Sequence, residues 1–311
     1  MKILVTGVNG FVGHHLAHSL RSKGCEVYGV GLQPTPAEEL KGILSKYFSL
    51  DLSDLDRVRQ LPLAKLDGVI SLAGLADVGK SFKEPEKYME INTSVVSNIS
   101  QCLIESSDNA VRHLAISSGA VYNSSQTPPF NEDSEVDSTS SPYVKSKLAM
   151  EKLCQGHRAQ GLDVIIARPF NHIGPGQEVG FLLPDLVTQI KKSLLDGAPI
   201  MVGNLDTRRD YTDVRDVANA YSLLIMNKPL KSFVYNVCSG KSVAGNQILD
   251  TVLDVLSKDK KPQVIVDPGR FRPSDAPELF GSPHRLHAET GWQTSIDLNQ
   301  TIHDFILGNA S

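Results

Sequence analysis

Three glycines, Gly7, Gly10 and Gly13, follow the first apolar segment of the chain at a regular spacing. The segment Lys2–Thr6 before them has the β-branched composition of a buried strand, and Phe11–Lys23 after them has a helical pattern. A glycine turn between a strand and a helix lets backbone N–H groups and the positive end of the helix dipole approach a diphosphate. The pattern therefore predicts a dinucleotide-binding unit at the start of the chain, and the alternative is a tight turn without a ligand.

Strand-like and helix-like segments alternate through the first half of the chain, which predicts an α/β fold with a Rossmann-type, doubly wound parallel sheet. We expect a dinucleotide-binding domain over residues 1–170, to which some later segments return, and a smaller substrate-binding lobe over residues 171–311. The expected strands of the first half are Lys2–Thr6, Glu26–Val30, Gly68–Leu72, His113–Ser117 and Asp163–Arg168. The expected helices are Phe11–Lys23, Tyr88–Ser106 and Pro142–Gln160, followed in the lobe by a helix at Leu183–Leu195 and strands at Ile200–Val202 and Phe233–Cys238.

Net charge and cysteine usage exclude several classes of function. The net charge of −4 over 311 residues provides no basic field for nucleic acid or an anionic membrane. The four cysteines form no Cys-x-x-Cys pair, so neither a metal site nor a disulfide framework is indicated. No apolar run reaches the ~18 residues that a membrane-spanning helix needs. We expect a cytoplasmic protein without a metal, nucleic-acid or membrane partner.

Tyr143 and Lys147 stand four residues apart in an expected helix, which Ser141 caps and Pro142 begins. The spacing puts the phenol and the ammonium on one helix face, about one turn apart. A tyrosine titrates near ~10, and a neighbouring positive charge lowers its pKa. The pair indicates acid–base chemistry at a carbonyl or carbinol carbon, and the alternative is an ordinary surface pair.

The type of nicotinamide cofactor is less clearly marked. The carboxylate expected about 20 residues beyond the glycines, which would bind the ribose of NAD, is absent. Gly29, Gly31 and Leu32 occupy that region, and no arginine marks a 2′-phosphate site. We favour NADP(H) over NAD(H), because without an acid at this position no carboxylate repels the 2′-phosphate of NADP(H). Asp51 and the sequence Leu72-Ala73-Gly74 follow two other apolar segments and are expected along the same sheet edge.

Several longer strings resemble one family of enzymes. Thr6-Gly-x-x-Gly-Phe-x-Gly13, Ser117-Ser118-Gly-Ala-Val-Tyr122, Tyr143-x-x-x-Lys147 and the string from Arg168 to Gln177 are similar to the extended short-chain dehydrogenase/reductases that act on nucleotide sugars. Within that family the chain looks most like the GDP-4-keto-6-deoxy-D-mannose reductases. The strings that carry this closer likeness are Arg168–Gln177, Val202–Asp213, Tyr235–Gly240 and Thr290–Trp292.

The resemblance implies a set of site residues. Ser118 would hydrogen-bond the substrate oxygen, Tyr143 would be the general acid, and Lys147 would hold the nicotinamide ribose and lower the pKa of Tyr143. The predicted dinucleotide contacts are Gly7, Asn9, Gly10, Phe11, Val12, Gly13, Asp51, Leu52, Leu72, Ala73, Gly74, Asn92, Tyr143, Lys147 and His172. The predicted substrate contacts are Ser118, Asn171, Phe181, Leu182, Pro184, Arg209 and Arg272.

Alternatives stay open for some of these residues. His172 could be a structural loop histidine, and Ser118 could satisfy backbone groups at a strand end. A guanidinium suits a diphosphate, so Arg209 and Arg272 are expected to clamp it, but an ion-pair network with nearby aspartates is the alternative and is favoured for Arg208.

The sequence departs from related 4,6-dehydratases at residues 119 and 120. Those enzymes carry an acid pair there that moves protons, whereas this chain has Gly119 and Ala120. Neither side chain can transfer a proton, which argues against dehydratase chemistry. Reductases of this family often have an acid at the position of Ala120, and Asn123 replaces the glycine that usually follows Tyr122. The first difference bears on substrate preference, and the second on the neighbouring loop Ser124–Pro129.

The resulting hypothesis is an NAD(P)H-dependent reductase of the C4 keto group of a nucleotide-linked 4-keto-6-deoxyhexose. The resemblance points to GDP-4-keto-6-deoxy-D-mannose as substrate and GDP-D-rhamnose as product. A nucleotide-sugar 4-epimerase with tightly bound NAD is the alternative, and a non-catalytic dinucleotide-binding regulator is a more distant one. The resemblance also implies a homodimer that packs through the helices Tyr88–Ser106 and Pro142–Gln160.

Overall fold

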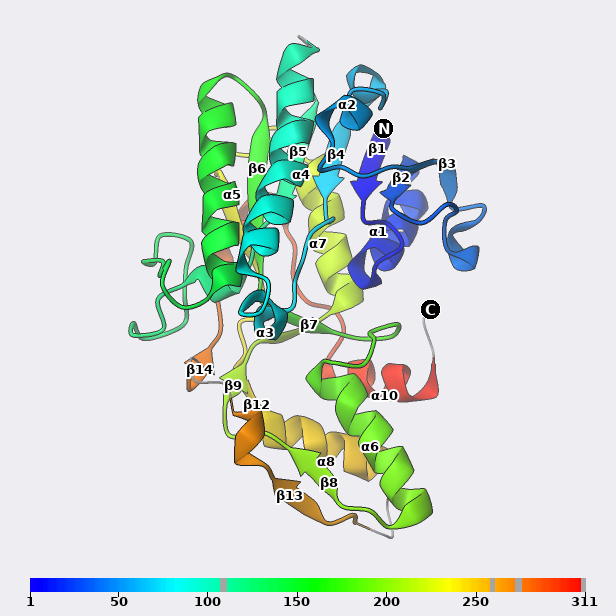
Figure 1. Ribbon diagram of the computed structural model, residues 1–311, viewed down its shortest axis with the longest axis vertical. Helices are drawn as coiled ribbons and strands as arrows, with labels where there is room; N and C mark the ends of the chain where they lie inside the picture. The colour runs from blue at the N-terminus through cyan, green and yellow to red at the C-terminus, as the bar shows by residue number, and fades with distance from the viewer. Residues whose placement is uncertain (107–110, 258–260, 272–275, 309–311) are drawn as a thin grey trace.

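Seven parallel strands form the main sheet, in the order β11-β6-β5-β4-β1-β2-β3 (Figure 1). The structure is a computed structural model that describes residues 1–106, 111–257, 261–271 and 276–308. The strands of this sheet are β1 (Lys2–Thr6), β2 (Glu26–Gly31), β3 (Leu44–Ser49), β4 (Gly68–Ser71), β5 (Arg112–Ile116), β6 (Val164–Pro169) and β11 (Val234–Val237).

Helices cover both faces of the main sheet, because successive strand residues point to opposite sides. On β1, Ile3 and Val5 pack into one buried cluster and Leu4 into another. The first cluster lies under α1 (Phe11–Ser22) and α7 (Val214–Met226). The second lies under α2 (Leu55–Val58), α4 (Pro85–Glu105) and α5 (Pro142–Ala159). The predicted α/β doubly wound fold is therefore confirmed.

The α5 helix begins where the sequence predicts. The Ser141 hydroxyl accepts a hydrogen bond from the Val144 amide at 3.2 Å, and Pro142 occupies the first turn. Most other predicted elements agree within a few residues, although α4 begins at Pro85 rather than Tyr88. The sequence did not predict β3, whose Leu44–Ser49 segment lies at the edge of the sheet and shows no regular alternation of polar and apolar residues.

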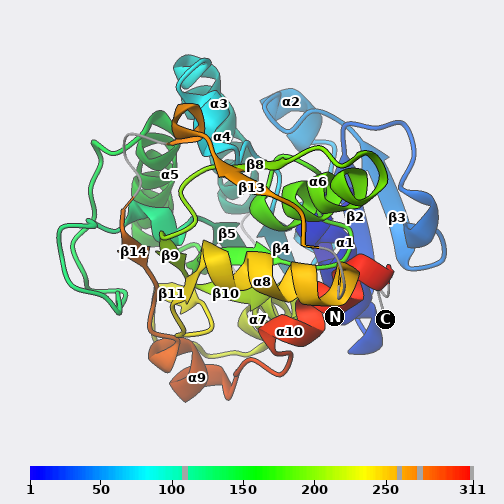
Figure 2. The ribbon, with the colours of Figure 1, turned by 90° about the horizontal axis from the view of Figure 1, so that it is seen from below.

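A smaller lobe lies below the main sheet in Figure 1 and is seen from its own side in Figure 2. Three short sheets and three helices build it around a separate buried cluster. Its strands are β7 (Asn171–Ile173), β8 (Ile200–Val202), β9 (Arg208–Arg209), β10 (Tyr211–Asp213), β12 (Val243–Ala244), β13 (Val264–Val266) and β14 (Glu278–Leu279). Its helices are α6 (Leu182–Asp196), α8 (Gly245–Leu256) and α10 (Leu298–Leu307). The short helix α3 (Val78–Ser81) packs beside α5 at the end of the main sheet that faces the smaller lobe, and α9 (His284–Thr290) packs beside β11.

The carboxyl ends of the parallel strands meet at the sheet edge that faces the smaller lobe. The glycine loop follows β1, Leu72 follows β4, Ser117 and Ser118 follow β5, and Phe170 follows β6. Ligands of open α/β sheets bind at this edge. Within the described residues, no helix has the length and apolar character needed to cross a bilayer, and no group of three or more potential metal ligands was found.

Candidate active site

A cavity of about 630 Å³ opens between the carboxyl edge of the main sheet and the smaller lobe. It brings together residues that are far apart in the sequence. Twelve of the predicted site residues line it: Asn9, Gly10, Phe11, Leu72, Gly74, Ser118, Tyr143, Lys147, Asn171, His172, Phe181 and Leu182.

The glycine loop has the close backbone packing that a diphosphate cradle requires. Gly7 adopts a φ of +63°, and a Cβ on Gly13 would lie 2.4 Å from the Gly7 carbonyl oxygen. Gly10 precedes α1 and contributes no side chain to cap the first amides of that helix. Gly10 and Phe11 line the cavity, so the amino end of α1 is open toward it. These residues fit the diphosphate of a dinucleotide cofactor.

The end of β2 shows why no acid stands there. A Cβ on Gly31 would lie 2.6 Å from the Tyr47 hydroxyl and 3.0 Å from Gln33 Oε1. Asn9 closes this cluster, because its amide nitrogen donates to the Tyr47 hydroxyl at 3.2 Å and to Gln33 Oε1 at 3.1 Å. Neutral side chains thereby connect the loop after β2 to the glycine loop. The side-chain amide of Asn9 forms these hydrogen bonds within the protein.

Ser118, Tyr143 and Lys147 converge on the cavity from two elements. Ser118 follows β5, and its hydroxyl lies close enough to the phenol of Tyr143 to oppose the rise of that group's pKa. Lys147 lies one turn beyond Tyr143 on α5, and its Nζ is 5.9 Å from the centroid of the tyrosine ring. Nζ also donates a hydrogen bond to the carbonyl oxygen of Ile116 at 2.9 Å. The predicted cluster is therefore assembled by the fold.

Burial controls the ionisation of this cluster. Burial raises the pKa of Tyr143, and the hydroxyl of Ser118 opposes that rise. Burial lowers the pKa of Lys147 to about 8, although the carboxylate of Glu151 opposes the fall. Burial is therefore the largest influence on the pKa of Tyr143, and the lowering of this pKa by Lys147 stays a prediction.

Other predicted site residues do not line the cavity. The side-chain amide of Asn92 donates to the Leu75 carbonyl and the Ser146 hydroxyl, and its oxygen accepts from the Leu75 amide. Both of its donors thus hold the protein's own groups around the loop after β4, and its role as a direct dinucleotide contact stays a prediction. Gly7, Val12, Gly13 and Ala73 support the loops behind the cavity, and Asp51, Leu52, Pro184 and Arg209 also lie outside its lining.

Of the two arginines predicted to clamp the diphosphate, Arg209 lies within the described residues. Arg209 Nη1 donates to the carbonyl oxygens of Arg208 and Ala276 at 2.8 Å each. Arg208 pairs with Glu278 at 3.3 Å, so the ion-pair alternative holds for it, although with a different acid from the aspartates expected. Arg272 lies outside the described residues.

The positions of the missing acids also have a structural explanation. A Cβ on Gly119 would lie 2.7 Å from the Phe170 ring, so any side chain there would displace that ring. Ala120 lines the cavity with a methyl group. Neither side chain can therefore supply a proton donor or acceptor next to Ser118.

Sequence reasoning missed several lining residues. They come from the loop after β4, from α1, from the segment after β7 and from two strands of the smaller lobe: His14, His15, Leu75, Ala76, Asp77, Val78, Pro175, Gln177, Glu178, Tyr211 and Leu279. Tyr211 lies in the string Val202–Asp213, in which the predictions concerned the arginines. Leu279 follows no motif, and only the fold brings it to the cavity.

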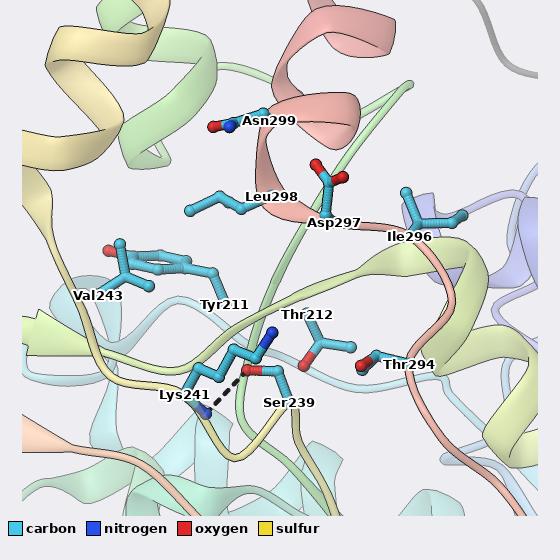
Figure 3. A pocket seen from close by; sticks show the side chains of 10 residues that line it. All are labelled: Tyr211, Thr212, Ser239, Lys241, Val243, Thr294, Ile296, Asp297, Leu298 and Asn299. Carbon is cyan, nitrogen blue, oxygen red and sulfur yellow. Dashed lines mark hydrogen bonds between the residues drawn. The ribbon is translucent and has the colours of Figure 1, made fainter.

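A second cavity of about 400 Å³ lies in the smaller lobe, between β10, the loop after β11 and the start of α10 (Figure 3). Lys241 and Asp297 line it, and the Lys241 amide donates to the Ser239 hydroxyl at 3.2 Å. Tyr211 borders both cavities. Among the residues that the structure describes, no predicted site residue lines this second cavity.

Comparison with known proteins agrees with this geometry. Residues 3–238 match the model of the NAD dependent epimerase/dehydratase family. The chain is 34% identical over 306 residues to the GDP-6-deoxy-D-mannose reductase of Pseudomonas aeruginosa, with 97% of this chain and 94% of the relative covered.

Two solved structures share the whole architecture. RMD from Pseudomonas aeruginosa complexed with NADPH superimposes with a TM-score of 0.82 at 31% identity, covering 99% of this chain and 98% of the other. The UDP-glucose 4-epimerase of Thermus thermophilus in complex with NAD superimposes with a TM-score of 0.85 at 25% identity, with complete coverage of both chains.

Proposed function

This chain belongs to the NAD dependent epimerase/dehydratase family, and from that premise we propose that it reduces the C4 keto group of a nucleotide-linked 4-keto-6-deoxyhexose. The observation that carries the proposal is the convergence of Ser118, Tyr143 and Lys147 in a cavity whose other strand-end positions, Gly119 and Ala120, hold no acid. Such a site can protonate an alkoxide but lacks the groups for eliminating water. The smaller lobe is proposed to hold the nucleotide sugar, and the main sheet the dinucleotide.

The preferred substrate is GDP-4-keto-6-deoxy-D-mannose and the product GDP-D-rhamnose. The support is the similarity to a GDP-6-deoxy-D-mannose reductase over nearly the full length of both chains. NADP(H) is preferred over NAD(H), because neutral Gly31, Gln33 and Tyr47 stand where an acid would repel a 2′-phosphate.

The proposed mechanism assigns one task to each residue. A bound nicotinamide dinucleotide supplies the hydride that reaches C4. Ser118 donates a hydrogen bond to the C4 oxygen and orients it toward the phenol. Tyr143 transfers its proton to that oxygen as negative charge develops on it. Lys147 stabilises the tyrosinate that is left, because its ammonium lies on the same helix face.

The direct test follows NAD(P)H oxidation by purified protein with freshly prepared GDP-4-keto-6-deoxy-D-mannose, with matching dTDP- and UDP-linked sugars as controls. The C4 configuration of the product is read by NMR. Tyr143→Phe is expected to lower kcat by about 10²- to 10⁴-fold while the Kd for the dinucleotide stays unchanged. Tyr28→Phe is the matched control, because the Tyr28 hydroxyl binds Glu26 away from the cavity. Full turnover by Tyr143→Phe would refute the mechanism.

A 4-epimerase is the second candidate, and the full-length superposition on a UDP-glucose 4-epimerase favours it. An epimerase returns the hydride to the same carbon and therefore retains its NAD through purification. Stoichiometric bound NAD, combined with interconversion of C4 epimers and no net oxidation of NAD(P)H, would establish this alternative. Dinucleotide binding without turnover of any nucleotide sugar would instead support the regulator.

A further inference from the structure

Glu151 has a buried carboxylate that takes no part in the proposed reaction. Tyr143, Lys147 and Glu151 follow one another on α5 at a spacing of four, so the three side chains lie along one helix face. Glu151 is 9% exposed. It accepts a hydrogen bond from the Ser117 hydroxyl at 2.5 Å, in the residue directly before Ser118.

Arg168 on β6 is the charged partner of Glu151. Its Nε donates to Glu151 Oε1 at 2.9 Å and its Nη2 to Oε2 at 2.6 Å, which is a bidentate arrangement. The guanidinium also lies 5.0 Å from the centroid of the Tyr122 ring, and its Nη1 is buried without a hydrogen-bond partner in the structure. The pair is therefore rigid and desolvated, which strengthens its field on neighbouring groups.

The surroundings of Lys147 make Glu151 the decisive neighbour. Tyr143 and Cys154 on α5 also face Lys147 and are neutral at pH 7, because burial raises the pKa of each. The Ile116 carbonyl of β5 accepts from its Nζ. From the side of α4, the buried Asn92 amide is uncharged. Among these described neighbours, Glu151 alone carries a negative charge, and Arg168 lies behind it.

We propose that Glu151 is a positioning residue that keeps Lys147 in its ammonium form beside Tyr143, and that Arg168 limits how strongly the Glu151 carboxylate acts on Lys147. Desolvation disfavours a buried ammonium, and a carboxylate one helical turn away compensates for it. The positive charge of the Arg168 guanidinium disfavours the ammonium of Lys147 and so offsets part of the stabilisation by the Glu151 carboxylate. The proposal rests on the proposed role of Lys147, and the direction in which Glu151 acts on the pKa of Lys147 supports it.

The test uses two variants that must act in opposite directions. The pKa of Lys147 is measured by NMR titration of protein labelled with ¹³C at lysine Cε, and the resonance is assigned by its loss in Lys147→Met. Glu151→Gln is expected to lower this pKa by about one unit, because a buried guanidinium is left to face the ammonium. Arg168→Gln is expected to raise it by about one unit, because the carboxylate then acts uncompensated. Arg168→Lys keeps the charge and is expected to leave it unchanged.

A structural role would give a different pattern. If both charge-removing variants shift the pKa of Lys147 in the same direction, or if neither shifts it, the proposal is wrong. Folding is checked by circular dichroism and thermal unfolding. Should Arg168→Gln fail to fold, the Glu151→Gln/Arg168→Gln double variant is compared with Glu151→Gln alone, and its Lys147 pKa must be the higher of the two.

A kinetic measurement separates this inference from the proposed reaction. If Lys147 must be charged, kcat/KM falls as pH rises through its pKa. The pH at which this alkaline limb of the kcat/KM profile falls should be lower in Glu151→Gln and higher in Arg168→Gln. A limb that stays in place while the Lys147 pKa moves would overturn the proposal. The NMR titration needs no substrate. It therefore tests the role of Glu151 even if the protein does not reduce the proposed sugar.

Discussion

The ring of Phe11 stacks on the imidazole of His172, with centroids 6.0 Å apart and ring planes inclined by 13°. The imidazole of His15 also contacts Phe11, with centroids 5.9 Å apart and the two ring planes nearly perpendicular. His172 is also held by its own main chain, because Nδ1 contacts the Phe170 carbonyl oxygen at 3.0 Å. The stack therefore ties the amino end of α1, where a diphosphate is expected, to the segment that enters the smaller lobe.

Replacing Phe11 by alanine should weaken dinucleotide binding. Each aromatic contact contributes about 0.5–1.5 kcal/mol, so loss of both is expected to raise the Kd for NADPH by roughly tenfold. Fluorescence titration of NADPH measures this Kd. Phe82→Ala is the matched control, because Phe82 is 56% exposed and lies outside the cavity lining. An unchanged Kd in Phe11→Ala would show that the stack does not organise the site.

Gly119→Ala should destabilise the fold. Its new methyl group would lie 2.7 Å from the Phe170 ring, and an overpacked core costs about 1–3 kcal/mol. Gly156→Ala provides the opposite case, since Gly156 lies inside α5 with nothing within 4 Å of the added carbon. That substitution is expected to raise the free energy of unfolding by about 1 kcal/mol. Urea unfolding compares the two, and equal midpoints would contradict the packing argument.

His113 should make stability depend on pH. It is completely buried on β5, between the Ser71 hydroxyl at 2.7 Å and the Ser100 hydroxyl at 2.9 Å, and burial lowers its pKa from 6.5 to about 3. At pH values between about 3 and 6.5, the imidazole of His113 is protonated in the unfolded chain and neutral in the folded protein. The contribution of His113 is therefore fully present above pH 6.5, and it is lost as pH falls, by about 1.4 kcal/mol per pH unit.

Urea unfolding at several pH values between 5 and 7 tests this dependence. The His113→Gln variant should be less stable at pH 7, yet its free energy of unfolding should fall less steeply toward pH 5 than that of the wild type. Parallel curves for the two proteins would show that another group causes the acid sensitivity.

Gly31→Asp should act on the choice of cofactor. The new carboxylate would stand beside Asn9 and Tyr47, where the ribose of the adenosine half is expected, and it would repel a 2′-phosphate. The ratio of the Kd for NADPH to the Kd for NADH is expected to rise by about tenfold, which corresponds to ~1.4 kcal/mol. Leu32→Asp, at the neighbouring and 73% exposed position, is the control for a general charge effect. An equal loss of affinity for both dinucleotides would indicate only steric damage.

The local features of the sequence predicted the fold class and the glycine loop, and they marked the residues proposed for catalysis. The spacing of Gly7, Gly10 and Gly13 and the alternation of β-branched and helical segments are local signals, and each corresponds to an element of the structure. The pair Tyr143 and Lys147 is local as well, since both residues lie on one helix. The hydrogen bonds of Asn92 are different, because a sequence cannot show that the fold uses its amide donors on Leu75 and Ser146.

Contacts between distant segments were decided by the tertiary structure alone. Leu279 reaches the cavity from β14, and Arg168 reaches Glu151 from another strand, although neither position follows a periodic pattern. The ionisation of Tyr143 and Lys147 was decided in the same way, because desolvation depends on what surrounds a group in space. The sequence thus determined which residues could do the chemistry, and packing across the sheet edge determined the environment in which they would do it.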